Sequence, residues 1–241
     1  MSIILYGDFT DLLSLVASLR ADTLIAAGAE IEWRAVVRTP TTTITAAPRS
    51  QEGRRELTQA AQRWREVSPT GESIEAPGPG FVPNAAAAAA GYAEAVGAGV
   101  GDHVRYLLFS SYWRAHLDIG NPDQLRRLLT VPILHGHSDS DVLRAYGDAV
   151  SIAGGPVTSS AWRLRNRWEK GWRAVDRRAL PAVVEGADVH IGSDAIRRLG
   201  TLGDAPQTIP HGNPYPLPPM RVAARRLDLA RPRGRAIWRD G

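Results

Sequence analysis

The sequence predicts an α/β fold in which a long helical segment interrupts a small sheet domain. Residues 1–38 have a strand-helix-strand pattern, residues 39–156 have helical patterns, and residues 157–200 have the pattern of a helix, two strands and a helix. A helical stretch inside an α/β frame indicates an insertion into one domain. We therefore expect a sheet domain from 1–38 and 157–200, an inserted helical subdomain from 39–156, and a Pro- and Arg-rich C-terminal tail from 201–241.

The first segment predicts two parallel strands joined by a helix. Residues 3–6 are an apolar run that predicts a buried strand. Apolar residues then recur at helical spacing over 12–19, with Asp11 as N-cap and Gly28 as the stop. Residues 31–38 alternate in the manner of a half-buried strand. The connection through a helix implies parallel strands with a right-handed crossover.

The inserted segment predicts several helices. An apolar stripe runs over residues 57–67, and Asn84 precedes six alanines that favour a helix. Asp102 is a candidate N-cap for the next helix. Asn121-Pro122 is a start signal for a helix over 122–129, because Pro is favoured at the first helical position.

The last ordered segment returns to mixed structure. Its first helix carries large apolar residues on one face, which we assign to the core rather than to a cofactor site: Ala161, Leu164, Trp168, Trp172 and Val175. Residues 181–184 and 189–191 predict two short strands around a Glu-Gly turn. Ser193 and Asp194 are expected to cap the final helix.

Cysteine is absent from the chain. Disulfides, thiolate metal sites and a cysteine nucleophile are therefore excluded. The first eight residues lack the cationic region of a secretory signal, and no run of eighteen apolar residues occurs. We expect a cytoplasmic protein without a membrane partner.

Basic charge is unevenly placed along the chain, whose pI is about 9.8. The tail, 201–241, has seven Arg and three Asp. Its net charge of +4 is therefore the net charge of the whole chain. Residues 1–200 are balanced, so nucleic acid is not an expected partner of the body. The Arg-rich tail is either a solvated extension or a binding segment for nucleic acid or an acidic partner.

Three segments resemble the DsbA-like branch of the thioredoxin superfamily, which includes 2-hydroxychromene-2-carboxylate isomerases and kappa-class glutathione transferases. Residues 8–14, DFTDLLS, resemble its strand-to-helix active-site turn, Asp-x-x-Cys-Pro-x-Cys or Asp-x-x-Ser-Pro-x-Ser. Residues 109–125, with Tyr112 and Asn121-Pro122, resemble its inserted helices. Leu180-Pro181 and residues 192–194 resemble its cis-proline and thiol-binding elements. The resemblance implies a thioredoxin-like fold with an inserted α-helical subdomain and a cis bond before Pro181.

The departures from that family pattern lie in the active-site turn. Asp11 stands where the resemblance places the nucleophilic Cys or catalytic Ser, Leu12 stands where Pro is usual, and Ser14 takes the second position. Disulfide oxidoreductase activity is therefore excluded. The resemblance instead implies a non-redox isomerase or transferase-like enzyme acting on a small molecule.

Asp11, with Thr10 or Ser14, is the candidate catalytic group. An ionised Asp11 at a helix N-terminus would repel a thiolate, but it could act as a general base if partly desolvated. Each of the three residues also has a structural reading: Asp11 as helix cap, Thr10 as turn residue, and Ser14 as a small residue in the first turn.

The resemblance also implies a ligand-holding set for glutathione or another low-molecular-weight thiol. Its members are Leu180, Pro181, Ser193 and Asp194. The alternative for Ser193 and Asp194 is helix capping without a ligand.

Two other functions stay open. One is a catalytically inactive, partner-binding pseudoenzyme whose cleft is filled by its own residues. The other is a metal-dependent hydrolase centred on His135 and His137, which follow an apolar run with the spacing of two ligands at one strand end. No metal is expected in the leading hypothesis, and a homodimer is a further expectation.

Overall fold

The computed structural model describes residues 2–39, 45–67, 78–136, 159–175 and 179–202. The strands are β1 (Ile3–Gly7), β2 (Ile31–Ala35), β3 (Ala47–Pro48), β4 (Phe81–Val82), β5 (Ala182–Glu185) and β6 (Asp188–Ile191). The helices are α1 (Leu12–Ala26), α2 (Gln51–Val67), α3 (Ala85–Gly97), α4 (Gly101–Trp113), α5 (Pro122–Gly136), α7 (Ser159–Val175) and α8 (Ser193–Thr201).

The main sheet has four strands in the order β2-β1-β5-β6. Strand β1 is parallel to β2 and antiparallel to β5, and β5 is antiparallel to β6. Tyr6 pairs with Ala182, which in turn pairs with Ile191. The ends of β1, β2 and β6 and the start of β5 therefore meet at one edge of the sheet, and the active-site turn predicted from the sequence lies there.

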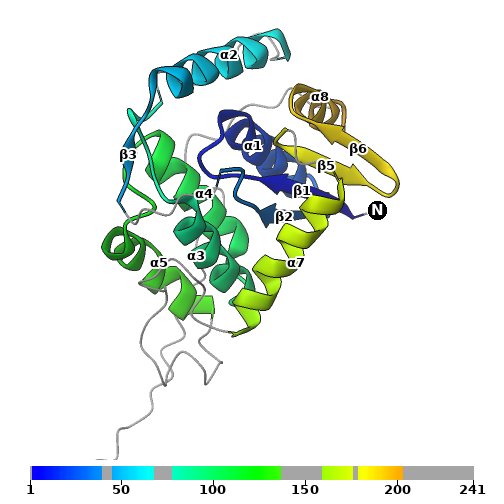
Figure 1. Cartoon of the computed structure of the whole chain (residues 1–241). Helices are drawn as coiled ribbons and strands as arrows, with labels where there is room; N and C mark the ends of the chain where they lie inside the picture. The colour runs from blue at the N-terminus through cyan, green and yellow to red at the C-terminus, as the bar shows by residue number, and fades with distance from the viewer. Residues whose placement is uncertain (1, 40–44, 68–77, 137–158, 176–178, 203–241) are drawn as a thin grey trace, which may run out of the picture.

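Helices cover both faces of this sheet (Figure 1). Helices α1 and α8 pack against each other on one face, while α7 packs on β2 and on α3 at the other. Gly171 of α7 makes the close approach possible, because a Cβ there would stand only 2.4 Å from the hydroxyl oxygen of Tyr6. The strand-helix-strand start and the terminal strand-strand-helix unit are both confirmed.

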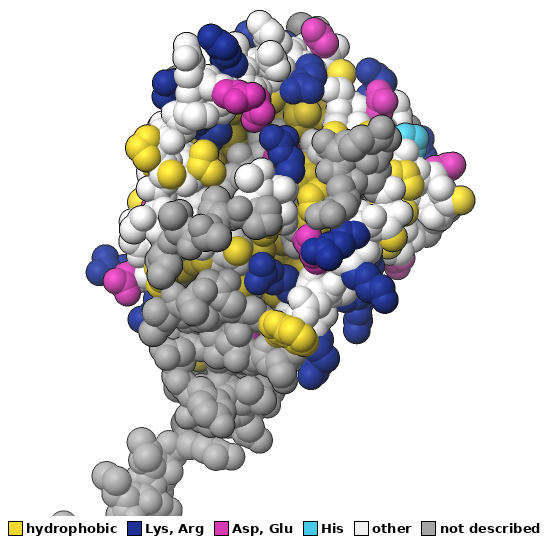
Figure 2. Space-filling model, in the orientation of Figure 1, with side chains coloured by type: hydrophobic (Ala, Val, Ile, Leu, Met, Phe, Trp, Pro, Cys, Tyr) yellow, Lys and Arg dark blue, Asp and Glu magenta, His cyan; other side chains and the backbone are white. Residues whose placement is uncertain are grey.

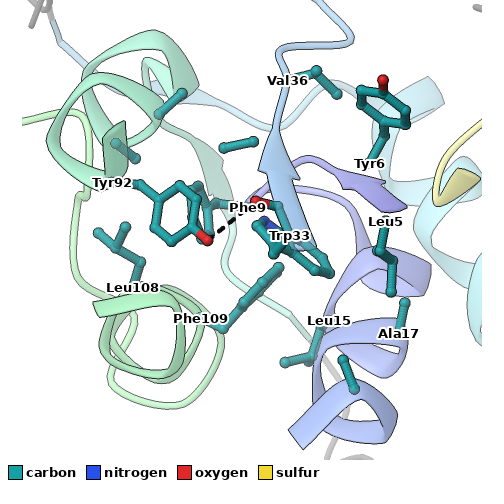
Figure 3. Packing of buried hydrophobic residues seen from close by; sticks show 14 of the residues in the cluster. Leu5, Tyr6, Phe9, Leu15, Ala17, Trp33, Val36, Tyr92, Leu108 and Phe109 are labelled. Carbon is teal, nitrogen blue, oxygen red and sulfur yellow. Dashed lines mark hydrogen bonds between the residues drawn. The ribbon is translucent and has the colours of Figure 1, made fainter. Parts of the chain in front are cut away.

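Aromatic side chains fill the space between the sheet and helices α3 and α4 (Figure 3). The ring centroid of Phe9 lies 5.7 Å from that of Tyr92 and 4.9 Å from that of Phe109, and Trp33 meets Phe109 edge-on at 5.5 Å. The Tyr92 hydroxyl donates to the Trp33 carbonyl at 3.3 Å. Such offset and edge-on pairs add to the free energy gained from apolar burial, so they join the sheet firmly to the helical segment.

A buried ion pair also joins α1 to α4. Asp22 and Arg105 are both almost fully buried, and Arg105 bonds Asp22 through Nη2 and Asp102 through Nη1. The Arg105 guanidinium lies 5.6 Å from the centre of the Trp33 ring. At the other end of α4, the Trp113 indole N–H donates to the carbonyl of Phe9 at 3.0 Å. Helix α4 is thus tied to both ends of α1.

Helix starts agree with the sequence at α1 and α3 and differ at α4. Asp11 caps α1 and Asn84 caps α3, each through a side-chain oxygen. The prediction that Asp102 caps α4 is wrong: the N-cap is Val100, two residues earlier and without a side-chain bond, and the helix begins at Gly101. Asp102 instead lies in the first turn and pairs with Arg105.

Helix α5 is longer than predicted. It begins at Pro122 as expected but continues to Gly136, with Pro132 inside it. Burial of Leu129 and Ile133 explains the extension, because they keep the apolar face in contact with the core. The small β3-β4 pair is a further feature that the helical patterns did not predict. Among the helices of the described ranges, none has the length and apolarity to span a bilayer.

Candidate functional site

The turn between β1 and α1 holds Asp11 in a fixed position. Asp11 has extended backbone angles and its carboxylate oxygen Oδ2 accepts from the Ser14 amide at 2.7 Å and from the Ser14 hydroxyl at 2.8 Å. This is the bond expected of an N-cap, because the first amides of a helix have no carbonyl partner within it. The side chain is 15% exposed.

Asp8 forms a second, deeper carboxylate beneath this turn. It is 2% exposed. Its Oδ1 accepts from the amide and the hydroxyl of Thr10, both at 2.8 Å, and its Oδ2 accepts from the Arg38 amide at 2.9 Å. The Asp8 amide donates to the Ser14 hydroxyl at 3.2 Å. Asp8 therefore joins the turn, α1 and the chain after β2.

Arg38 brings a third carboxylate to the site. Its Nη1 lies 4.0 Å from Asp11 Oδ1, and its Nη2 lies 3.4 Å from Glu56 of α2. The Arg38 side chain is 43% exposed, so its cation faces solvent beside the Asp11 carboxylate. The sequence assigned no role to Asp8, Arg38 or Glu56. For Asp8, the available signal was an acidic residue directly after a buried strand.

The electrostatics of the turn follow from its burial. Desolvation raises the pKa of Asp11 to about 6, and the negative charge of Asp8 acts in the same direction. The hydrogen bonds from Ser14 and the cation of Arg38 oppose the rise. Burial also raises the pKa of Asp8, against its bonds from Thr10 and Arg38. Asp11 is therefore a carboxylate that changes protonation close to neutral pH.

The two hydroxyls at the turn are already engaged. Thr10 donates to Asp8, and the fully buried Ser14 donates to Asp11 while accepting from the Asp8 amide. Both residues thus position carboxylates and have no proton left to give to a ligand. Within the described ranges, no hydrogen bond reaches Oδ1 of Asp11. Oδ1 is therefore the Asp11 oxygen that could accept a hydrogen bond or a proton from a ligand.

The peptide bond between Leu180 and Pro181 is cis, as the family resemblance implied. The Pro181 carbonyl accepts from the Gly192 amide at 2.8 Å. Because Tyr6 pairs with Ala182, continuing that antiparallel register sets Leu180 across from Asp8. In the part of the chain that the structure describes, no hydrogen bond reaches the Leu180 backbone.

Ser193 and Asp194 lie at the start of α8, at the same edge of the sheet. The prediction that they cap this helix is wrong, since Gly192 is the N-cap, with φ of 58° and no side-chain bond, and Ser193 is the first helical residue. A positive φ suits glycine, which has no Cβ to clash. Asp194 forms an exposed ion pair with Arg197.

Tyr112, which the family resemblance singled out, is held on α4. Its hydroxyl accepts from Arg49 at 2.7 Å and donates to the Phe81 carbonyl at 2.8 Å. Burial raises the pKa of Tyr112 to about 12, against the effect of Arg49. Tyr112 therefore stays protonated at neutral pH and fixes the β3-β4 pair to α4.

The metal hypothesis finds no geometric support in the described segments. His135 lies in the last turn of α5 and not at a strand end, with Nδ1 2.9 Å from the Val131 carbonyl. His137 lies outside the described residues. No three His, Cys, Asp or Glu side chains within the described ranges are grouped so that they could hold a metal ion.

Comparisons with known proteins give a likeness of structure. No family model and no curated protein matches the sequence. A probable DsbA oxidoreductase from Streptomyces coelicolor is similar with a TM-score of 0.59 and 14% identity, over 83% of this chain and 87% of that one. The cytosolic disulfide reductase DsbM from Pseudomonas aeruginosa is similar with a TM-score of 0.55 and 11% identity, over 84% of this chain and 95% of that one.

These structural similarities confirm the predicted fold. Because the sequence identities are low, they support the fold alone and no shared function. Both neighbours are named for disulfide chemistry, whereas this chain has no cysteine and carries Asp11 and Ser14 at the start of α1. The chain therefore has the thioredoxin fold with a helical insertion, as in DsbA-like oxidoreductases, without a redox cysteine.

Proposed function

We propose that the chain is a non-redox enzyme of the isomerase type, in which Asp11 moves a proton on a small molecule. The observation that carries this proposal is the state of the Asp11 carboxylate. One oxygen is held by two bonds from Ser14, the other accepts no hydrogen bond within the described ranges, and the pKa is about 6. A general base works best when its pKa lies near the working pH.

The surrounding groups suit proton abstraction next to a carbonyl. Asp11 Oδ1 would take a proton from carbon, and the electron pair of the broken C–H bond would move onto the carbonyl oxygen as an enolate. The Arg38 cation, 4.0 Å from Asp11 and partly exposed, is placed to offset that charge. Asp11 would then return the proton to a different carbon, so that the substrate is isomerised without gain or loss of atoms.

A low-molecular-weight thiol such as glutathione is the cofactor that the family resemblance implies. The residues present do not fit a thiolate, because Ser14 already donates to Asp11 and an ionised Asp11 would repel a sulfur anion. The proposed reaction therefore needs no thiol. Glutathione is proposed only as a peptide-like ligand of the free Leu180 backbone. A calorimetric titration with glutathione that gives no measurable heat would exclude it as a ligand.

The test is enzyme-dependent deuterium exchange. A panel of small carbonyl compounds with an acidic α-C–H is incubated in D2O and followed by NMR. We expect exchange whose rate rises as pH increases through about 6, where Asp11 loses its proton. Asn keeps the helix cap but cannot accept the proton, so Asp11→Asn should lower the rate by about 10²- to 10⁴-fold.

Asp123→Asn is the matched control, because it makes the same change on an exposed side chain in the first turn of α5, outside the candidate site, and should leave the rate unchanged. Exchange that persists in Asp11→Asn would exclude Asp11 as the base.

The second candidate is a partner-binding pseudoenzyme. The observation that favours it is the engagement of Thr10 and Ser14, which leaves Asp11 explicable as a helix cap. It predicts that no compound of the panel exchanges and that Asp11→Asn alters stability alone. The metal-dependent hydrolase centred on His135 and His137 stays a prediction. Stoichiometric zinc, iron or manganese in the purified protein would support it.

A further inference from the structure

Helix α7 uses one side for the core and presents the other to solvent. Trp168 and Trp172 are almost fully buried, as is Ala161. The opposite side is polar and basic. We name this side the α7 basic face and define it by its exposed residues Trp162, Arg163, Asn166, Arg167, Lys170 and Arg173.

The cations of the α7 basic face are largely without partners. Arg163, Arg167 and Lys170 follow one another at helical spacing, and none of them makes an ion pair or hydrogen bond within the described ranges. Arg173 pairs with Glu169 at 3.5 Å. Figure 2 shows Lys and Arg side chains gathered over the part of the surface where Figure 1 draws α7. Three neighbouring unpaired cations on a rigid helix favour an anionic ligand.

Within the described ranges, no acidic side chain forms an ion pair with Arg163, Arg167 or Lys170. Helix α7 packs on β2, where Glu32 is already bonded by the Arg34 guanidinium at 2.6 and 2.9 Å. Residues 1–200 have no net charge, but their charges are unevenly distributed. Helix α7 has five basic residues and one acidic residue, so the rest of residues 1–200 carries four excess negative charges. The expectation that the body does not bind nucleic acid was based on net charge, and the α7 basic face is a local exception.

An exposed aromatic ring adds a second kind of contact. Trp162 is 56% exposed and stands beside Arg163 at the beginning of the helix. Aromatic side chains next to cations are the arrangement that holds single strands, because each base can stack on a ring while its phosphate meets a cation. From Arg163 to Arg173 the helix rises about 15 Å, which is long enough to follow several phosphates of one strand.

The two other anionic partners fit less well. A membrane-surface helix needs an apolar side to insert among lipids, and the apolar side of α7 is buried against the protein. A duplex has no unpaired base for Trp162 to stack on. From the unpaired cations, the exposed Trp162 and the buried apolar side, we infer that the α7 basic face binds single-stranded nucleic acid, RNA or DNA.

The test measures binding of the full chain to labelled 20-nucleotide strands of deoxythymidine and of uridine by fluorescence anisotropy, over a series of salt concentrations. The triple variant Arg163→Gln, Arg167→Gln and Lys170→Gln should weaken binding at least tenfold at low salt. It should also lower the slope of log affinity against log salt by about 2, since each phosphate contact to a single strand contributes about 0.7. Trp162→Ala should weaken binding about tenfold through lost stacking.

The matched control removes three exposed cations from α2, by Arg54→Gln, Arg55→Gln and Arg63→Gln, with the same change in net charge. It should retain the affinity of the unaltered protein, and circular dichroism should show that both triple variants fold. An equal loss of affinity in the two triple variants, or unchanged affinity in the α7 variant, would overturn the inference. The Arg-rich tail would then be the candidate binding segment. Equal or tighter binding to a duplex of the same length, or to phosphatidylserine vesicles, would overturn it too.

Discussion

Helices α1 and α8 begin at the same edge of the sheet, but their first turns differ. The N-cap of α1 is Asp11, whose carboxylate bonds the Ser14 amide. The N-cap of α8 is Gly192, which has no side chain, and the acidic Asp194 in its first turn is bound to Arg197 on the surface. Both turns offer free backbone amides to an anion, yet burial and a second carboxylate distinguish the α1 turn.

The difference shows that a helix N-terminus alone does not make this site. At α1, the buried Asp8 holds Thr10 and Arg38 in place, and Trp113 closes over the Phe9 carbonyl. Removal of water from this turn raises the pKa of Asp11. At α8, Asp194 stays in solvent. Three predictions use α8 as the reference for α1, and the largest expected effect comes first.

Replacing Asp8 should cost the most stability. Asp8→Ala leaves the amide and hydroxyl of Thr10 and the amide of Arg38 without their acceptor. Because unsatisfied buried donors each cost about 1–3 kcal/mol, we expect a loss of about 3 kcal/mol in the free energy of unfolding, measured by urea denaturation. Asp194→Ala should cost less than about 1 kcal/mol. Equal losses for the two variants would show that Asp8 does not hold the turn together.

The pH dependence of stability should reveal Asp11 next. Its pKa is higher in the fold, at about 6, than its ordinary value of 3.8. Between these values the folded state binds a proton that the unfolded state has released, so stability falls as pH rises from about 4 to about 6. Asp11→Asn should remove about 2 kcal/mol of this fall, given about 1.4 kcal/mol per pKa unit and partial solvent screening.

Urea denaturation at several pH values checks this contribution. Asp194→Asn should follow the unaltered protein over the same range. A profile for Asp11→Asn parallel to that of the unaltered protein would contradict the raised pKa.

The smallest effect is expected from the serines. Ser14→Ala removes the hydroxyl that donates to Asp11 and accepts from the Asp8 amide, which should cost about 1 kcal/mol. Since the Ser14 bonds lower the pKa of Asp11, the variant should also raise that pKa, as read from the carboxyl carbon shift by NMR. Ser193→Ala, at the start of α8, should change stability by less than about 0.5 kcal/mol. A lowered pKa in Ser14→Ala would show that the hydroxyl does not stabilise the ionised form.

Most of the sheet frame could be predicted from local patterns. Residues 3–6 and 31–38 showed the periodicity of strands, and the Asp11 cap followed from residue type alone. The start of α8 was predicted wrongly because Gly192 reaches a positive φ that a composition rule for Ser and Asp does not include. The extension of α5 was missed because the contacts that hold Leu129 and Ile133 come from other helices.

Only the residues of the candidate site that are close together in the sequence could be predicted. Asp11, Thr10 and Ser14 lie within one short segment, and its resemblance to the active-site turn of the family predicted them. Arg38, which follows β2, and Glu56 of α2 lie near the turn through long-range contacts, which no local pattern indicates. The role of Asp8 depends on its burial, which is a property of the packed chain. The raised pKa values depend on the same burial and were likewise hidden from the sequence.

In the proposed enzyme, the contacts between α1 and α4 restrict how a substrate could reach Asp11. Arg105 and Asp22 join these helices at one end, and Trp113 bonds the Phe9 carbonyl at the other. A rotation of α4 away from the sheet would separate a buried ion pair and leave its charges uncompensated, which is strongly unfavourable. In the proposed enzyme, we therefore expect the substrate to enter beside α2, where the exposed contact of Arg38 with Glu56 is a weaker barrier than the buried ion pair.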